Sequence, residues 1–129
     1  MIVKSILNAV TSDLKYMRVE QSISVPDRLQ AQSKNVGELI ARLRVARGIK
    51  QTEAAIRAGI SRNTAYRLEK GDPGLAFGQI LRYLDAIAPG TTLEMLFEQK
   101  DPALLALAVR ERRTRVRDMS AQERDELNF

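Results

Sequence analysis

Apolar residues recur every three or four positions along most of this chain, which is the spacing that gives a helix one apolar face. The first such stretch covers residues 3–19 and contains Val3, Ile6, Leu7, Val10, Leu14 and Met17. Residues 22–26 alternate between polar and apolar side chains and end in a proline, so we expect an extended connector there. Helical spacing resumes after Asn35, which stands three positions before Glu38 as in a capping box. The pattern therefore predicts one helix over residues 3–19 and a second that begins after Asn35 and ends at Gly48.

Four further short helices are predicted: residues 51–58, residues 62–70, residues 76–88 and a last one that ends at Phe97. Gly59 stops the first of these four, and Ser61 is a strong N-terminal cap for the second. Thr91 and Glu94 have the spacing of a capping box in front of the last. The third has an apolar face that we expect to point into the core, formed by Phe77, Ile80, Leu81, Leu84 and Ile87.

The C-terminal part of the chain predicts one more helix. Asp101 can cap it and Pro102 suits its first position. Its apolar part is Leu104, Leu105, Leu107 and Ala108, and the sequence becomes basic beyond Val109. No internal repeat and no convincing strand pattern is present, so the predicted fold class is all-α. We expect three parts: residues 1–35 as a helical extension and connector, residues 36–98 as a five-helix domain, and residues 99–129 as a basic amphipathic tail.

The composition excludes several kinds of chemistry. Cys and His are both absent from the 129 residues, so disulfides, Cys/His zinc sites, thiol nucleophiles and histidine bases are excluded. No paired carboxylates and no phosphate-binding glycine loop stand out, and we expect no catalytic residue, no metal and no cofactor. No apolar run approaches the length of a membrane span, and the N-terminus lacks the layout of a secretory signal. We therefore expect a cytoplasmic protein that is not an enzyme and has no membrane partner.

The net charge points to an anionic partner. Lys and Arg number 21 against 16 Asp and Glu, a formal charge of +5 at pH 7. Residues 42–70 hold eight cations opposed only by Glu53 and Glu69, so this window carries more than the whole net charge. A second basic cluster contains Arg110, Arg112, Arg113, Arg115 and Arg117. For this second cluster, a solvated helix face and a binding surface are about equally good interpretations.

Residues 51–71 have the features of two helices joined by a sharp turn. Gly59 supplies the positive φ that such a turn needs, and Ile60 fills the corner beside it. Small side chains on the first helix allow a close approach, while Ala65 and Leu68 of the second face inward. This arrangement predicts a helix-turn-helix motif. The side chains left outward on its second helix are Arg62, Asn63, Tyr66 and Arg67.

The outward side chains suit the major groove of double-stranded DNA. Arginine can form two hydrogen bonds to guanine and asparagine two to adenine, each pair discriminating by roughly 1–3 kcal/mol. Tyr66 can contact a thymine methyl or a phosphate, or simply pack on a neighbour. The candidate base contacts are therefore Arg62, Asn63, Tyr66 and Arg67. The candidate contacts to the DNA backbone are Gln51, Thr52, Arg57, Ser61 and Lys70.

Residues 36–98, which contain these candidate contacts, resemble the XRE family, the Cro and phage-repressor type of helix-turn-helix regulators. The resemblance rests on Arg44 before Gly48, Gln51, the Ala-Gly-Ile-Ser run at 58–61, the Arg-Leu-Glu-Lys-Gly run at 67–71, and Leu84 with Leu96. The resemblance implies a repressor-like five-helix fold. It also implies that Gln51 contacts phosphate, that Arg62, Asn63 and Arg67 face bases, and that Arg44 forms a structural ion pair with Glu69. Three positions depart from the family pattern: Lys50 in place of a capping residue, Ala54 in place of leucine, and Ala76 in place of a capping serine.

The sequence thus predicts a homodimeric, sequence-specific DNA-binding regulator, acting as a repressor of its own gene at a palindromic operator. A second hypothesis is an antitoxin, similar to the HipB group, that binds a toxin protein as well as its operator. Under that hypothesis residues 102–129 or the helix over residues 3–19 would order against the toxin. Alternatively, these outer segments only build the dimer.

Overall fold

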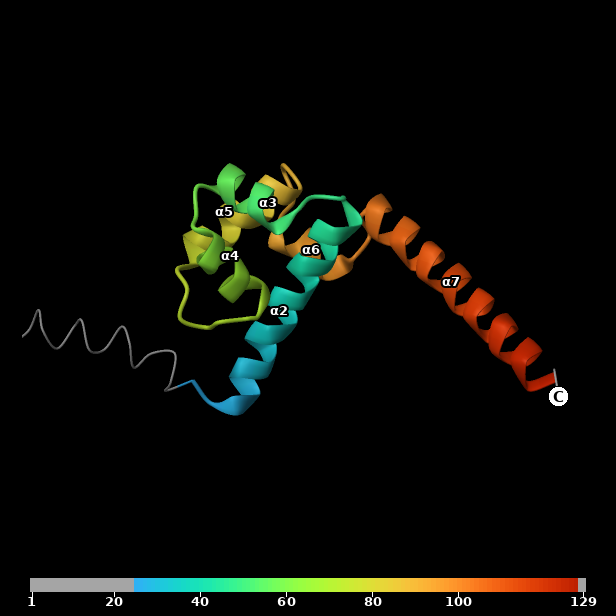
Figure 1. Cartoon of the computed structure of the whole chain (residues 1–129). Helices are drawn as coiled ribbons and strands as arrows, with labels where there is room; N and C mark the ends of the chain where they lie inside the picture. The colour runs from blue at the N-terminus through green and yellow to red at the C-terminus, as the bar shows by residue number, and fades with distance from the viewer. Residues whose placement is uncertain (1–24, 128–129) are drawn as a thin grey trace, which may run out of the picture.

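The computed structural model describes residues 25–127, which form an all-α structure as predicted. Its helices are α2 (Asp27–Ala46), α3 (Gln51–Ala58), α4 (Arg62–Glu69), α5 (Phe77–Ile87), α6 (Leu93–Glu98) and α7 (Pro102–Leu127). The described part of the chain contains no strand. Helices α2 to α6 gather into one body, from which α7 extends outward (Figure 1). The helix predicted over residues 3–19 lies outside the described residues.

Helix α2 begins at Asp27, so the predicted start at Asn35 is wrong. Pro26 precedes the first turn, which carries the acidic side chain of Asp27, and the helix continues through Asn35 without a break. Residues 27–34 contain neither glycine nor proline, and nothing in them stops a helix. Asn35 and Glu38 have the spacing of a capping box, but they lie within the helix.

Gly37 lets α2 pass very close to the end of α4. A Cβ atom at this position would lie 2.6 Å from the Leu68 carbonyl oxygen and 2.8 Å from the Gly71 amide nitrogen. The Ser33 hydroxyl donates a hydrogen bond of 2.8 Å to the Gly71 carbonyl oxygen at the same crossing. The backbone of α2 therefore packs directly against the backbone at the end of α4. Glycine is needed at position 37 because a larger side chain would not fit, not because of its φ angle.

The hydrophobic core lies between these helices. Its buried members are Ile40, Leu43, Ala54, Ala55, Ala58, Ala65, Leu68, Tyr83, Leu84, Ile87, Ala88, Leu96 and Leu104. Two residues of α5 that were predicted to point inward are exposed, Phe77 by 62% and Leu81 by 40%, whereas Tyr83 is fully buried. Ile80, Leu84 and Ile87 set the inner face of α5, and the neighbouring elements cover the flank that carries Tyr83 instead of the flank that carries Leu81.

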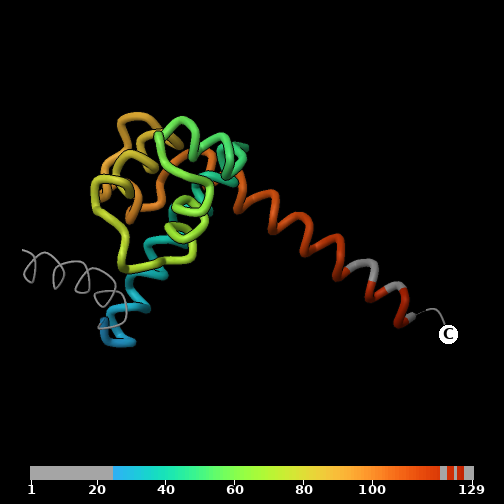
Figure 2. The backbone as a smooth tube through the Cα atoms, turned by 60° about the vertical axis from the view of Figure 1, so that its left-hand side comes forward, coloured from blue at the N-terminus to red at the C-terminus, as the bar shows by residue number. Residues whose placement is uncertain are grey.

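The ends of the last two helices depend on local caps. Thr92, one residue after the predicted cap Thr91, accepts a hydrogen bond of 3.2 Å from the Met95 amide at the start of α6. Asp101 accepts one of 2.9 Å from the Ala103 amide, which confirms the predicted start of α7. From there α7 runs for 26 residues and leaves the body, as both views show (Figures 1 and 2). Within residues 25–127, no helix is both long enough and apolar enough to cross a membrane.

Candidate nucleic-acid interface

The turn between α3 and α4 has the geometry that its sequence predicted. Gly59 has a φ of 67°, in the left-handed region that glycine adopts without strain. The Ile60 amide donates a hydrogen bond of 3.1 Å to the Ala55 carbonyl oxygen, which closes the end of α3. Ala55, Ala58 and Ala65 are buried at this junction, so the two helices meet through small side chains.

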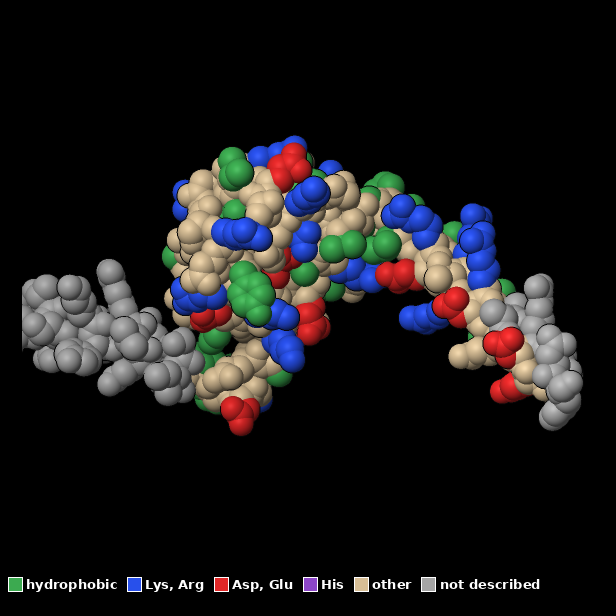
Figure 3. Space-filling view, viewed as in Figure 1, with side chains coloured by type: hydrophobic (Ala, Val, Ile, Leu, Met, Phe, Trp, Pro, Cys, Tyr) green, Lys and Arg blue, Asp and Glu red, His purple; other side chains and the backbone are tan. Residues whose placement is uncertain are grey.

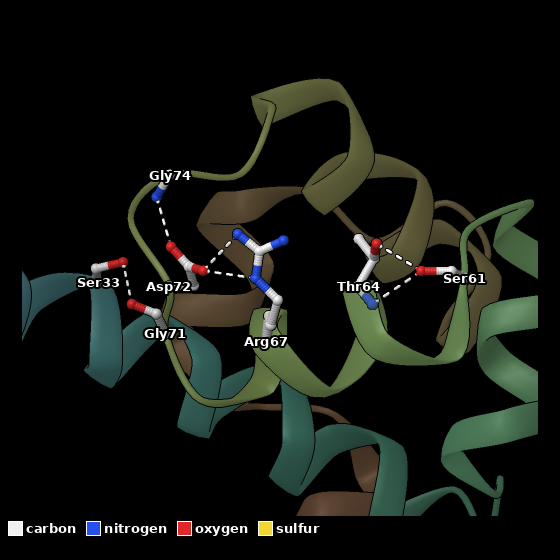
Figure 4. A network of polar contacts seen from close by, with 7 residues as sticks. All are labelled: Ser33, Ser61, Thr64, Arg67, Gly71, Asp72 and Gly74. Carbon is white, nitrogen blue, oxygen red and sulfur yellow. Dashed lines mark hydrogen bonds and ion pairs between the residues drawn. The ribbon is translucent and has the colours of Figure 1, made fainter. Parts of the chain in front are cut away.

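Ser61 caps α4 and fixes its direction. Its hydroxyl oxygen accepts a hydrogen bond of 3.0 Å from the Thr64 amide and lies 2.7 Å from the Thr64 hydroxyl oxygen (Figure 4). The exposed first turn of α4 is therefore held by its own side chains. The cap predicted at Ser61 is thus confirmed, and its predicted contact to DNA stays a prediction.

The outward face of α4 presents polar side chains to solvent. The side chains of Arg62 and Asn63 are exposed and form no hydrogen bond or ion pair with the described part of the chain. Tyr66 is 52% exposed, and the Lys70 ammonium lies 5.6 Å from the centre of its ring. Lys and Arg side chains gather over the region of α4 in Figure 3. Arg62 and Asn63 thus keep their donors available for a partner.

Arg67 is held by a carboxylate that the sequence interpretation did not connect with it. Its Nε donates a hydrogen bond to Asp72 Oδ2, and its Nη2 pairs with the same oxygen, each at 2.7 Å (Figure 4). The Gly74 amide donates a hydrogen bond of 2.8 Å to the other Asp72 oxygen. Burial disfavours the charge on Asp72, but Gly74 and Arg67 outweigh it and hold the pKa of this carboxyl below its usual value. The Asp72-Pro73-Gly74 turn signal could have indicated this role for Asp72.

Glu69, the last residue of α4, joins four helices through one carboxylate. It is only 8% exposed, and its Oε1 accepts a hydrogen bond of 2.7 Å from the Arg44 Nε of α2. Its Oε2 accepts hydrogen bonds from the Gln51 amide of α3 and from the Tyr83 hydroxyl of α5, the latter at 3.2 Å. Arg44 also donates a hydrogen bond of 2.8 Å to the Ile49 carbonyl oxygen. Burial, together with the nearby charge of Glu69, raises the pKa of Tyr83 well above its usual value.

The Glu69 network brings Arg44 and Glu69 together and also engages Gln51. One amide hydrogen of Gln51 is therefore directed into the protein, although the side chain was expected to contact phosphate. The sequence analysis did not predict a role for Tyr83, because the apolar spacing of α5 does not distinguish it from the residues beside it. Tyr83 lies three positions after Ile80, a spacing that places both on one side of a helix, and this was the signal that could have indicated its burial.

The start of α3 offers backbone donors. Arg57, further along α3, pairs with Glu53 at 2.5 Å in an exposed position. At the start of the helix, the side chain of Lys50 accepts no hydrogen bond, so it does not cap the backbone amides of Gln51 and Thr52. The N-terminal end of α3 is therefore suited to an anion such as a phosphate group.

A hollow of about 460 Å³ lies beside the outward face of α4. It is lined by Lys34, Glu38, Ala41, Arg44, Gln51, Tyr66, Glu69 and Lys70. Lys34 comes from the first part of α2, a stretch that the sequence pattern left without an assignment. The structure thus adds one cation to the surroundings of Tyr66 and Lys70.

The comparison with known families agrees with this geometry. Residues 35–93 match the family described as a helix-turn-helix domain. The match includes α3, the glycine turn and α4, and it supports the resemblance to XRE-type regulators. Residues 35–93 are therefore similar to helix-turn-helix domains of the XRE-like type. No curated protein and no solved structure matches the chain.

Proposed function

We propose that this protein is a sequence-specific transcription regulator that places α4 in the major groove of double-stranded DNA. The observation that carries the proposal concerns Arg62 and Asn63. Both side chains are exposed, and within the described part of the chain they form no hydrogen bond or ion pair. Their functional groups match the hydrogen-bonding edges of guanine and adenine. Ser61 fixes the start of α4 and Glu69 fixes its end, so the two side chains are presented on a rigid helix.

The remaining candidate residues take different parts in this proposal. Tyr66 supplies an apolar contact at the centre of the face, beside Lys70. The first amides of α3, together with Lys70 and Arg57, contact phosphates on either side of the groove. Arg67 reads a base only if its guanidinium turns from Asp72 or uses its remaining nitrogen, so we assign it a smaller part in base recognition than Arg62.

We further propose that two copies bind one palindromic operator and repress transcription by excluding RNA polymerase. In helix-turn-helix dimers the two recognition helices enter major grooves one turn apart, about 34–36 Å. A symmetric pair of α4 helices would then read two identical half-sites.

Selection of duplexes from a random pool, followed by titration of single variants, tests this function. Arg62→Ala and Asn63→Ala should each weaken binding to the selected duplex by roughly 1–3 kcal/mol and relax the preference at one base pair. Leu81→Ala, which changes an exposed residue of α5, serves as a control that should leave the base preference intact. Equal loss of affinity on every sequence would show that these residues contact phosphate only. The absence of any preferred duplex at low salt would refute the function itself.

A further inference from the structure

Helix α7 exposes a stripe of apolar side chains after it leaves the body. The stripe contains Leu105, Val109, Val116 and Met119, which are between 41% and 62% exposed. The side of α7 that faces the body is a different one, because Leu104 is buried in the core and Glu111 pairs with Arg42 of α2 at 3.0 Å. The stripe therefore lies on the part of α7 that the body does not cover.

The stripe follows the spacing of a coiled-coil seam. Positions 109, 112, 116, 119, 123 and 126 alternate in steps of three and four, so they share one face of the helix. Val109, Val116 and Met119 supply apolar side chains to this face, whereas Arg112, Glu123 and Glu126 supply charged ones, and all six are exposed. A hollow lined by Arg112, Arg113, Val116 and Arg117 lies along the same stretch.

The charges of α7 are separated into two halves. Residues 110–117 contain five arginines and one glutamate, and that glutamate is the partner of Arg42. Residues 118–126 contain four carboxylates and one arginine. In Figure 3 red side chains lie on the outer part of α7. Each half of the helix thus carries the charge that would attract the other half.

We propose that two copies of this protein pair through α7 in an antiparallel coiled coil centred between residues 117 and 118. In this register Val116 packs against Met119 of the second copy, and Arg112 lies opposite Glu123 of the second copy. Each contact occurs twice because of the two-fold symmetry. The basic half of one helix then lies along the acidic half of the other. This pairing rests on the proposed two-copy function and names the surface through which the copies meet.

The charges select both the orientation and the partner. A parallel pair would place Arg112 against Arg112 and Glu123 against Glu123, and like charges at the seam disfavour such a pair. An antiparallel pair turns every one of these contacts into an attraction. A second copy of the chain supplies the complementary pattern at the same distance from the midpoint, which is why we choose it as the occupant.

Charge-swap variants of the full-length chain test the pairing by sedimentation equilibrium at low salt. Arg112→Glu and Glu123→Arg, each alone, should weaken self-association by about tenfold or more, because both symmetric contacts then join like charges. An equal mixture of the two variants should recover the dimer, because both contacts in the mixed pair join opposite charges again. The double variant R112E/E123R should dimerise like the unchanged chain.

Matched controls lie on the outer face of the same helix. Arg110→Glu and Asp125→Arg make the same charge changes away from the seam and should leave the dimer mass unchanged. Circular dichroism checks that each variant keeps its helix content. A monomeric unchanged chain, single swaps without effect, or single swaps that the mixture does not rescue would each overturn the pairing.

Titration of the same proteins with the selected duplex separates this inference from the proposed function. If the chain binds the duplex as a dimer and the swaps leave its mass unchanged, the α7 pairing is wrong while the regulator function stands. If the swaps behave as expected but no duplex is preferred, the pairing stands and the regulator function fails. Both results together, rescue in the mixture and preferred binding to one duplex, support the two proposals.

Discussion

At the scale of single residues, the side chains of the recognition region differ in what they already contact. The side chains of Arg62 and Asn63 have no partner in the described part of the chain, so the proposed binding to DNA would break no bond that they form inside the protein. Arg67 and Gln51 are engaged by Asp72 and Glu69. The sequence analysis named all four as candidate DNA contacts, Arg62, Asn63 and Arg67 as outward side chains and Gln51 at the start of its helix, because periodicity and position record where on a helix a residue lies. It could not show which of them a carboxylate from a later turn or helix would bind.

Glu69 offers a test at this scale. We expect Glu69→Ala to lower the free energy of unfolding by about 3 kcal/mol, because it leaves the partly buried Arg44 charge, the Gln51 side-chain amide and the Tyr83 hydroxyl without their acceptor. Glu53→Ala is the control, since its exposed pair with Arg57 contributes only about 0.3–0.5 kcal/mol. Urea unfolding of both variants gives the comparison. Similar losses for the two would contradict a structural role for the Glu69 network.

At the scale of helices, prediction succeeded where the signal was local. The bounds of α3 and α4 follow from Gly59 and Ser61, whose roles depend on their own φ and on an amide three residues away. The start of α2 was predicted too late because Asn35 and Glu38 have the spacing of a capping box. In the structure the helix begins at Asp27, and these two residues lie inside it. The burial of Tyr83 was missed because it depends on what packs beside α5, which periodicity alone does not specify.

Gly37 provides a prediction for the crossing of α2 and α4. Although alanine favours helix, Gly37→Ala should destabilise the protein by about 1–3 kcal/mol, because its Cβ would press on the backbone of Leu68 and Gly71. Gly78→Ala in α5 is the matched control, since nothing lies within 4 Å of its added Cβ, and it should stabilise by about 0.5–1 kcal/mol. Thermal unfolding of both variants decides the point. A stabilising Gly37→Ala would mean that the two helices are not in backbone contact in solution.

At the scale of the whole molecule, the charged side chains form two surfaces that lie apart in space. The body carries the cations around α4, whereas α7 carries its own arginines and carboxylates away from the body (Figure 3). The net charge predicted an anionic partner for the chain but could not assign the second basic cluster. The structure makes that assignment possible, because it shows that α7 is one long helix leaving the core.

The salt dependence of DNA binding checks this separation. We expect affinity for the selected duplex to fall steeply with salt, and Lys70→Ala to reduce the slope of log K against log salt by about 1, because one phosphate contact is lost. Lys100→Ala, at an exposed site between α6 and α7, should leave the slope unchanged. Fluorescence anisotropy over a range of salt concentrations measures both. Equal slopes for the Lys70 variant and the unchanged chain would remove Lys70 from the interface.

The carboxylate at the end of α4 also has a consequence for how the domain folds. Its partners come from α2, α3 and α5, and Arg44 lies 25 positions earlier in the chain. A chain that has formed α4 but not these neighbours has none of the bonds that hold the end of this very short helix, and such a helix is marginal alone. Native-state hydrogen exchange should therefore find the amides of α4 opening together with those of α2 and α5, as a single cooperative unit. The surface that we propose for DNA binding then exists only when the domain is completely folded.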